Sequence, residues 1–290
     1  TAVGRQCMLS NTTGTANTAI GHEALEANTT ANNNTAVGYE ALLANTTGTQ
    51  NNAIGAYALD ACTTGERNQA MGKAALTALT TGYRNVAIGN DSMVTLTSAY
   101  HNVAVGEQTL FNATSSGNTA IGYKALIATT TGEENVALGK NAGSNITTGS
   151  NNTVLGHDAV HPSATGDNNF ILGNSSIQHL RCQVSSIESL SDERDKTNIV
   201  DLTEGLDLIN TLKPRKFTWA MREASANNGL TQIGFVAQEL DTAFGSSNDY
   251  CRIVDKQDPD KLAVAQGQLI PILVNAIKEL SAKVTALEAG

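Results

Sequence analysis

One glycine recurs at nearly constant spacing through the first part of this 290-residue chain. Nine of the ten intervals between successive copies are 17 residues long, and the interval from Gly106 to Gly122 is 16. From Gly21 onward, an asparagine stands four positions before each copy. A period held this long indicates a solenoid, in which every repeat forms one coil that stacks on the last. The glycines are Gly4, Gly21, Gly38, Gly55, Gly72, Gly89, Gly106, Gly122, Gly139, Gly156 and Gly173.

Each repeat is too short for a pair of helices and is interpreted as two extended pieces. The first has the form N-x-A-I-G, and the second reads roughly x-x-A-L-x-A before a T-T-G turn. Glycine adopts positive φ at little cost, and asparagine suits ladders or left-handed corners. We therefore expect structural roles for both residue types rather than ligand binding.

The extended piece before each glycine is apolar on both of its faces. Ala19 and Ile20 point in opposite directions along a strand, and the equivalent positions are apolar in nearly every repeat. A strand that is apolar on both faces must be covered on both. One 17-residue coil has a single inside, so we expect copies of the chain to pack around a common axis. Eleven rungs at about 4.8 Å would span on the order of 50 Å.

Composition excludes several classes of protein. The net charge of −9 argues against non-specific binding of nucleic acid, which needs a basic face. The sequence has no run of 18 apolar residues and no visible signal peptide, so neither membrane insertion nor a leader is expected. It opens inside a repeat, which predicts that it is a fragment.

The sequence holds no pattern typical of a cofactor or metal site. The four cysteines are scattered without a C-x-x-C pair, which favours reduced thiols: Cys7, Cys62, Cys182 and Cys251. His157 and His161 are interpreted as surface histidines rather than metal ligands. We expect no cofactor.

The repeats end before residue 190, where the composition changes. The first 190 residues contain 19 charged side chains, and the last 100 contain 26. We expect a fibre shaft over residues 1–175, an extended connector over residues 176–190 and a small mixed α+β domain over residues 191–290. That domain is predicted to contain a helix over Gly205–Leu212, strands over Lys216–Ala220 and Thr231–Ala237, and a helix from Gln268 to the end.

The last helix carries an apolar seam with spacings of 4, 3, 4 and 3 residues, formed by Leu273, Ile277, Leu280, Val284 and Leu287. Two explanations stay open: a coiled coil between copies, or packing of the helix against its own domain. Taken alone, leucine at d with isoleucine or valine at a favours two strands in a parallel coiled coil. The repeat pattern leads us to expect three.

Ser191 and Lys196 stand five residues apart in S-D-E-R-D-K. This spacing suits neither a shared helix face nor one side of a strand. Only a turn through Asp192 to Asp195 would bring the two side chains together. By itself the pair is a weak signal, because most serines flanked by charges are solvated.

The N-T-A-I-G-x-x-A-L units resemble the head repeats of trimeric autotransporter adhesins and repeats in phage tail fibres. The resemblance covers about residues 1–175. It implies an all-β solenoid built as a trimeric parallel β-roll or β-prism.

Three motifs of the second part occur in combination: S-D-x-R-x-K at Ser191, L-K-P-R-x-F-x-W over Leu212–Trp219 and I-G-F-V-A-Q-E-L over Ile233–Leu240. Together they resemble the intramolecular chaperone auto-processing domain of phage endosialidases, tailspikes and fibres, which also occurs in a membrane-bound animal transcription factor. The resemblance implies that Ser191 is the nucleophile, Lys196 the general base and Leu190–Ser191 the bond cut.

We therefore expect a homotrimeric phage tail-fibre segment for host attachment, released by single-turnover cleavage and found in the virion after assembly in the host cytoplasm. Its expected external partner is a host cell-surface receptor, a glycan. The alternatives are a polysaccharide-degrading tailspike or a bacterial trimeric adhesin head with the same chaperone. A sugar hydrolase needs two carboxylates at defined separation, and acidic residues in the repeats occur singly. A membrane-tethered transcription factor would need a DNA-binding domain or a membrane span, and the sequence shows neither.

Overall fold

The computed structural model describes residues 1–177, 179–181, 183, 191–220, 228–260 and 262–290. The chain divides into two compact units, residues 1–175 and residues 176–290, and each is described by itself.

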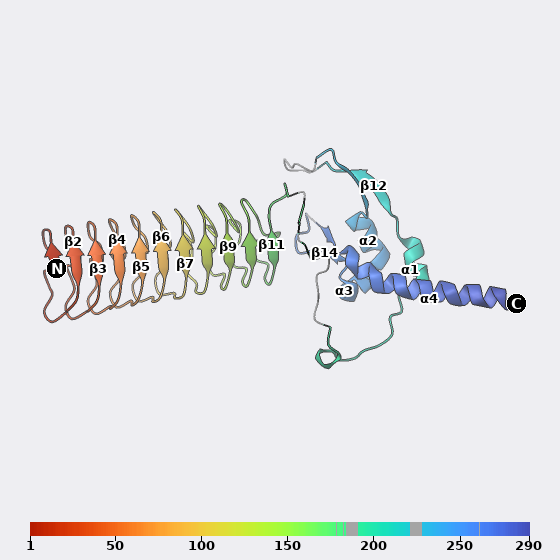
Figure 1. The fold of residues 1–290 in the computed structure, drawn as a ribbon, viewed down its shortest axis with the longest axis horizontal. Coiled ribbons are helices and arrows are strands. Elements are labelled where there is room, and N and C mark those ends of the chain that lie inside the picture. The colour runs from red at the N-terminus through yellow and green to blue at the C-terminus, as the bar shows by residue number, and fades with distance from the viewer. Residues whose placement is uncertain (178, 182, 184–190, 221–227, 261) are drawn as a thin grey trace. The chain divides into compact units, whose positions relative to one another are not determined.

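The first unit is a parallel β-solenoid with one short strand per rung (Figure 1). Each strand pairs with the strand of the next rung, with Ala19 opposite Ala36 and so on at a spacing of 17 residues. In the 16-residue rung the register shifts by one, so that Val103 lies opposite Thr119. The solenoid predicted from the glycine period is thus confirmed. The strands are β1 Ala2–Val3, β2 Thr18–Ile20, β3 Thr35–Val37, β4 Asn52–Ile54, β5 Gln69–Met71, β6 Val86–Ile88, β7 Val103–Val105, β8 Thr119–Ile121, β9 Val136–Leu138, β10 Thr153–Leu155 and β11 Phe170–Leu172.

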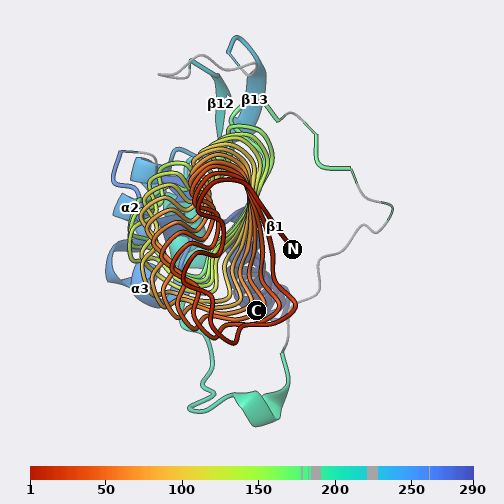
Figure 2. The ribbon, with the colours of Figure 1, turned by 90° about the vertical axis from the view of Figure 1, so that its left-hand side faces the viewer.

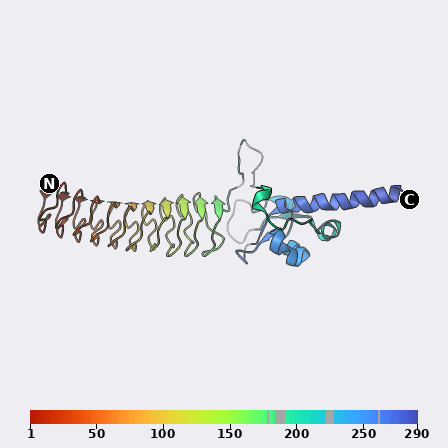
Figure 3. The same cartoon turned by 90° about the horizontal axis from the view of Figure 1, so that it is seen from below.

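Successive rungs nearly superimpose when the solenoid is viewed along its length (Figure 2), and the strands form one continuous sheet along one side (Figure 3). The prediction of a second extended piece in each repeat is wrong. That segment is a turn that contains left-handed residues, for example Glu23 at φ 57° and Leu25 at φ 54°. The left-handed conformation directs a leucine or methionine of each of seven rungs into the interior, where its side chain is fully buried: Leu25, Leu42, Leu59, Leu76, Met93, Leu110 and Leu126.

The repeated glycine marks the corner that follows each strand. From Gly4 to Gly156 these glycines have φ between 121° and 145°, a region closed to other residues. A Cβ on Gly21 would also collide with the carbonyl oxygen of Gly38, one rung on. The glycine is therefore fixed both by the backbone angle and by the close stacking of the rungs.

The asparagine four positions before each glycine forms a ladder through the interior. The Oδ1 atom of Asn85 accepts a hydrogen bond from the backbone N–H of Asn102 at 3.1 Å, and its Nδ2 donates to the carbonyl of Ala99 at 2.8 Å. The backbone N–H of Asn85 donates to Oδ1 of Asn68 in turn at 3.0 Å. Each buried asparagine thus joins two rungs and satisfies a turn carbonyl that water cannot reach.

The middle and last residues of each strand face opposite sides. The alanine in the middle is buried in nearly every rung, as at Ala19, Ala36 and Ala87. The last residue stays on the surface, and six of these large apolar side chains are between 38% and 51% exposed: Ile20, Ile54, Met71, Ile88, Ile121 and Leu138. We call the row formed by these six residues the outer stripe. Within one chain, only the inner face of the sheet is covered.

His157 is exposed as expected, but the prediction of a surface position for His161 is wrong, because its side chain is buried. Its Nε2 lies 3.1 Å from Oδ1 of Asn152, and its backbone N–H donates to Oδ1 of Asn145. Burial lowers the pKa of the His161 ring below its usual value. The side chain is thus part of the hydrogen-bond system at the end of the asparagine ladder.

The second unit combines short helices with two antiparallel hairpins. The predicted helices are confirmed to within one residue at their starts, and both predicted strands are present but shorter. The segment from Ala237 begins a helix instead of ending a strand. The elements are η1 Glu193–Asp195, α1 Leu206–Thr211, β12 Arg215–Thr218, β13 Thr231–Gly234, α2 Ala237–Phe244, η2 Gly245–Ser247, α3 Asn248–Cys251, β14 Val254–Asp255, β15 Ala263–Val264, η3 Gln266–Gln268 and α4 Leu269–Glu288.

The core of the second unit is small and joins α2, β14 and the first half of α4. Its buried side chains are Leu240, Phe244, Ile253, Val254, Leu269 and Ile272. Helix α4 packs through Leu269, Ile272 and Ala276, so the predicted seam is not the face that it turns to its own domain. All five seam residues are exposed. Among the described helices, none combines the length and the hydropathy that a membrane crossing requires.

We predict that Asn85→Ala lowers the free energy of unfolding of the shaft by about 2–5 kcal/mol. The substitution leaves the N–H of Asn102 and the carbonyl of Ala99 buried without their partner, at about 1–3 kcal/mol each. Thermal or denaturant unfolding measures the change. The control is Asn90→Ala, which removes one exposed bond to the N–H of Lys73 and should cost under about 1 kcal/mol. Equal stability of the two variants would contradict a structural role for the ladder.

We also predict that Cys62 resists alkylation in the folded protein at neutral pH. Burial raises the pKa of its thiol to about 12, and the thiolate is the reactive form. Mass spectrometry after treatment with iodoacetamide should find Cys62 unmodified in the native chain and modified after denaturation. Rapid modification without denaturant would show that the rungs around it open.

Candidate autoprocessing site

A short turn brings Ser191 close to Lys196. Residues Glu193–Asp195 form a single turn of 3₁₀ helix, closed by hydrogen bonds from the N–H of Asp195 to the carbonyl of Asp192 at 3.2 Å and from the N–H of Lys196 to the carbonyl of Glu193 at 3.1 Å. The chain therefore reverses within the segment where the sequence required a turn.

The two side chains meet across this turn. Nζ of Lys196 donates to Oγ of Ser191 at 2.6 Å and to the carbonyl of Ser191 at 3.1 Å. Both residues are exposed, as are their neighbours through Asp201. The arrangement joins a hydroxyl to an amine, the two groups that a serine–lysine dyad uses.

Asp192 and Arg194 form an ion pair on the same turn. Asp192 is the N-cap residue, and its Oδ1 accepts from the backbone N–H of Arg194 at 2.9 Å. The guanidinium of Arg194 also reaches back to the carboxylate, with Nε 3.0 Å from Oδ1 and NH2 2.6 Å from Oδ2. The guanidinium lowers the pKa of the Asp192 carboxyl, and the carboxylate raises the pKa of Arg194.

The chain joins the folded body of the unit after this exposed segment, at Leu202–Leu206. Nδ2 of Asn275 donates to the carbonyl of Glu204 at 2.9 Å and to that of Leu202 at 3.2 Å. Oε2 of Glu279 accepts from the N–H of Leu206 at 2.8 Å and satisfies a free donor at the start of α1. Helix α4 thus fixes the segment that leads out of the turn.

The Glu204 side chain forms a second anchor. It accepts hydrogen bonds from the hydroxyl of Tyr250 and from that of Ser247, the latter at 2.9 Å. The bond from Tyr250 lowers the pKa of the Glu204 carboxyl and raises the pKa of the tyrosine. These contacts attach the same segment to α3 and the turn before it.

The other half of the expected cleavage site, Leu190, lies outside the described residues, as does Cys182. For the metal expectation, the described parts of the chain hold no group of three or more histidine, cysteine, aspartate or glutamate side chains able to bind an ion.

The anchoring residues Glu204, Asn275 and Glu279 were missed by the sequence analysis, because they lie about 70 residues apart and no local pattern joins them. The N-cap role of Asp192 had a visible signal. An aspartate at the start of a short polar segment is typical of a cap.

The comparison with protein-family models agrees with this assignment of the second unit. Residues 191–247 match the model of the peptidase family S74, described as the chaperone of endosialidase. No curated protein and no solved structure gave a significant match. The match begins at Ser191 and includes the turn, α1, β12, β13 and α2. Residues 191–247 therefore belong to a chaperone-of-endosialidase domain, which stands behind a β-solenoid of 17-residue repeats.

Proposed function

We propose that the chain is a segment of a homotrimeric phage tail fibre whose C-terminal chaperone drives trimerisation and folding and then releases itself by cutting Leu190–Ser191. The observation that carries this proposal is the contact of 2.6 Å between Nζ of Lys196 and Oγ of Ser191. It lies at the first residue of a domain whose family implies self-cleavage.

The proposed reaction needs no group beyond the two side chains and water. Oγ of Ser191 attacks the carbonyl carbon of Leu190, while Nζ of neutral Lys196 takes the hydroxyl proton and delivers it to the departing amide nitrogen of Ser191. The Leu190 acyl group is then held as an ester on Oγ. Water hydrolyses this ester and leaves a carboxylate on Leu190 and a free amine on Ser191. Because the nucleophile belongs to the bond that it breaks, each chain is cut once.

Lysine serves as a base only when desolvation or nearby positive charge lowers its pKa. Ser191 and Lys196 are exposed in the single chain, where water solvates the ammonium group. In the proposed trimer, neighbouring copies cover this segment and desolvate the lysine. This order couples cleavage to assembly.

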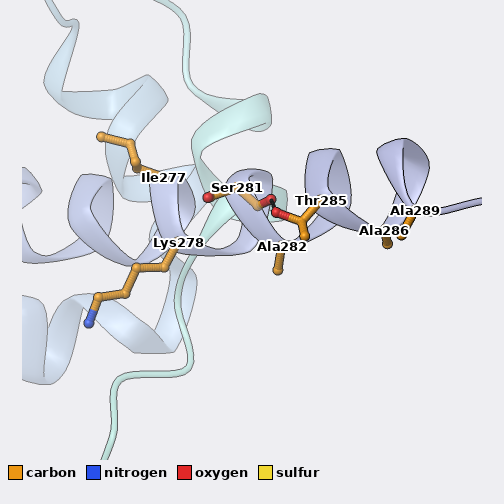
Figure 4. A pocket seen from close by; sticks show the side chains of 7 residues that line it. All are labelled: Ile277, Lys278, Ser281, Ala282, Thr285, Ala286 and Ala289. Carbon is orange, nitrogen blue, oxygen red and sulfur yellow. Dashed lines mark hydrogen bonds between the residues drawn. The ribbon is translucent and has the colours of Figure 1, made fainter.

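Two apolar surfaces support association of identical chains. The outer stripe runs along the shaft, and a row of this length is typical of an interaction surface. The seam of α4 is the second surface. Beside it, the small side chains Ser281, Ala282, Thr285, Ala286 and Ala289 follow α4 beyond Ile277 and Lys278 (Figure 4). Small side chains let a neighbouring helix approach closely.

A detachable chaperone suits a shaft of this kind. All strand pairs of the solenoid are parallel and join residues about 17 apart, and the proposed trimer adds pairing between chains. Such assembly is slow and exposes strand edges. A trimeric C-terminal domain raises the local concentration of the three chains and sets their register. After release, the high barrier to unfolding keeps the shaft intact.

The proposed external partner is a glycan receptor on the host surface. Exposed aromatic rings on the shaft support this assignment, because sugar rings stack on such faces. Tyr83 and Tyr100 lie in adjacent rungs, stacked at 5.0 Å between ring centroids, and Arg84 lies over the Tyr83 ring. A second group joins His22, Tyr39 and Tyr57.

We predict that Ser191→Ala and Lys196→Ala each abolish self-cleavage. Denaturing electrophoresis should show one full-length band in place of two, because either change removes half of the dyad. Ser246→Ala and Lys213→Ala, at exposed positions of the same unit, are the controls and should be cut like the wild type. Normal processing of either dyad variant would rule out the proposed mechanism.

We further predict that Ile54→Glu combined with Ile88→Glu weakens the trimer. Each isoleucine is expected to lose about 1.5–3 kcal/mol of burial per chain, and the carboxylates add the cost of desolvation. Light scattering measures the mass. Gln50→Glu adds the same kind of charge at an exposed corner away from the outer stripe and should leave the trimer intact. A wild-type chain that is stable as a monomer would refute the assembly.

A further inference from the structure

The contact between Ser191 and Lys196 depends on one short turn. Six residues in an extended chain would separate the side chains by well over 10 Å. The turn has no buried side chain, and its two closing hydrogen bonds are exposed to water. Such bonds contribute little by themselves, and a single helical turn is unfavourable to nucleate. A local contact must therefore hold the turn.

The ion pair of Asp192 and Arg194 is the contact that meets this requirement. Asp192 accepts three hydrogen bonds from Arg194, one from the backbone and two from the side chain. The backbone bond caps the turn, and the side-chain pair is bidentate, which fixes geometry as well as adding energy. In the described segment from Ser191 to Asp201, the other side-chain hydrogen bonds are those from Lys196 to Ser191.

We propose that Asp192 and Arg194 are positioning residues for self-cleavage, because their ion pair locks the turn that holds Nζ of Lys196 on Oγ of Ser191. This inference rests on the proposed function. Neither side chain reacts, and each acts through the geometry of the dyad.

The pairing replaces a different role suggested by the charges alone. A free Arg194 would lower the pKa of a neighbouring lysine, and a free Asp192 would raise it. In the structure the two charges neutralise each other within 3 Å. The carboxyl pKa of Asp192 is lowered, so the ion pair is complete above the usual carboxyl range and is lost only as the pH falls through that lowered value. It is therefore fully formed at any pH at which a lysine acts as a base.

The two roles predict opposite signs for a pair of substitutions. If the charges tuned Lys196, Asp192→Ala would free a positive charge and speed cleavage near neutral pH, and Arg194→Gln would free a negative charge and slow it. If the ion pair holds the turn, both substitutions slow cleavage. The plateau rate should fall roughly 3- to 30-fold, as expected for loss of a helix cap. The midpoint of the pH profile should stay unchanged.

The experiment uses the full chain, made by pulsed cell-free synthesis and then followed by electrophoresis at several pH values after translation is stopped. The variants are Asp192→Ala, Asp192→Asn and Arg194→Gln. Asparagine is as good a cap as aspartate but loses the ion pair, so Asp192→Asn should be cut faster than Asp192→Ala. Glu193→Gln is the matched control, since it removes a carboxylate from the same turn without touching the pair. Light scattering and thermal unfolding should find all variants equal to the wild type in assembly and stability.

The outcomes separate this inference from the function on which it rests. If Ser191→Ala is cut normally in the same assay, the proposed function fails. If Ser191→Ala is not cut but Asp192→Ala and Arg194→Gln are cut at the wild-type rate, only the positioning role is overturned. Opposite changes in the two variants, with a shifted pH midpoint, would also overturn it in favour of charge tuning.

Discussion

The structure of the shaft depends on hydrogen bonding between equivalent residues of adjacent rungs. Each strand has at most three residues, which is too little pairing to be stable alone. Stacking eleven such strands makes every inner rung the template for the next. The asparagine ladder adds to this by satisfying buried backbone groups on two rungs at once. The same dependence makes an isolated rung unstable, so the shaft must be started by something outside the rung itself.

The face that this stacking leaves uncovered connects the shaft to its chaperone. Alanine is used on the inside because the coil is narrow, and the larger isoleucine points outward on the same strand. The α4 seam has the same property, since the helix turns other side chains to its own core. Both units thus carry apolar rows that a single chain leaves open, and one assembly step would cover both. A domain that self-associates and then removes itself is the simplest partner for a shaft with this surface.

Much of this organisation could be predicted from the sequence, because it depends on period. The glycine at each corner has a backbone angle that only glycine favours, so its spacing directly reports the coil. The second segment of each repeat was misjudged because Leu25 and its equivalents adopt the left-handed conformation against their own preference, held there by tertiary packing. His161 was misjudged for a related reason, since its burial follows from stacking at the end of the ladder and not from local pattern.

At the candidate site, the sequence predicted that a turn was needed between Ser191 and Lys196, but not how the turn is held. The ion pair of Asp192 with Arg194 depends on side-chain geometry that only the folded turn defines. The anchors on α4 join residues about 70 positions apart. The most direct test of the account is the intact mass and N-terminal sequence of the smaller fragment from freshly folded full-length protein. The account predicts a fragment of residues 191–290 that starts at Ser191. A fragment with another N-terminus, or a folded trimer that stays uncut, would contradict it.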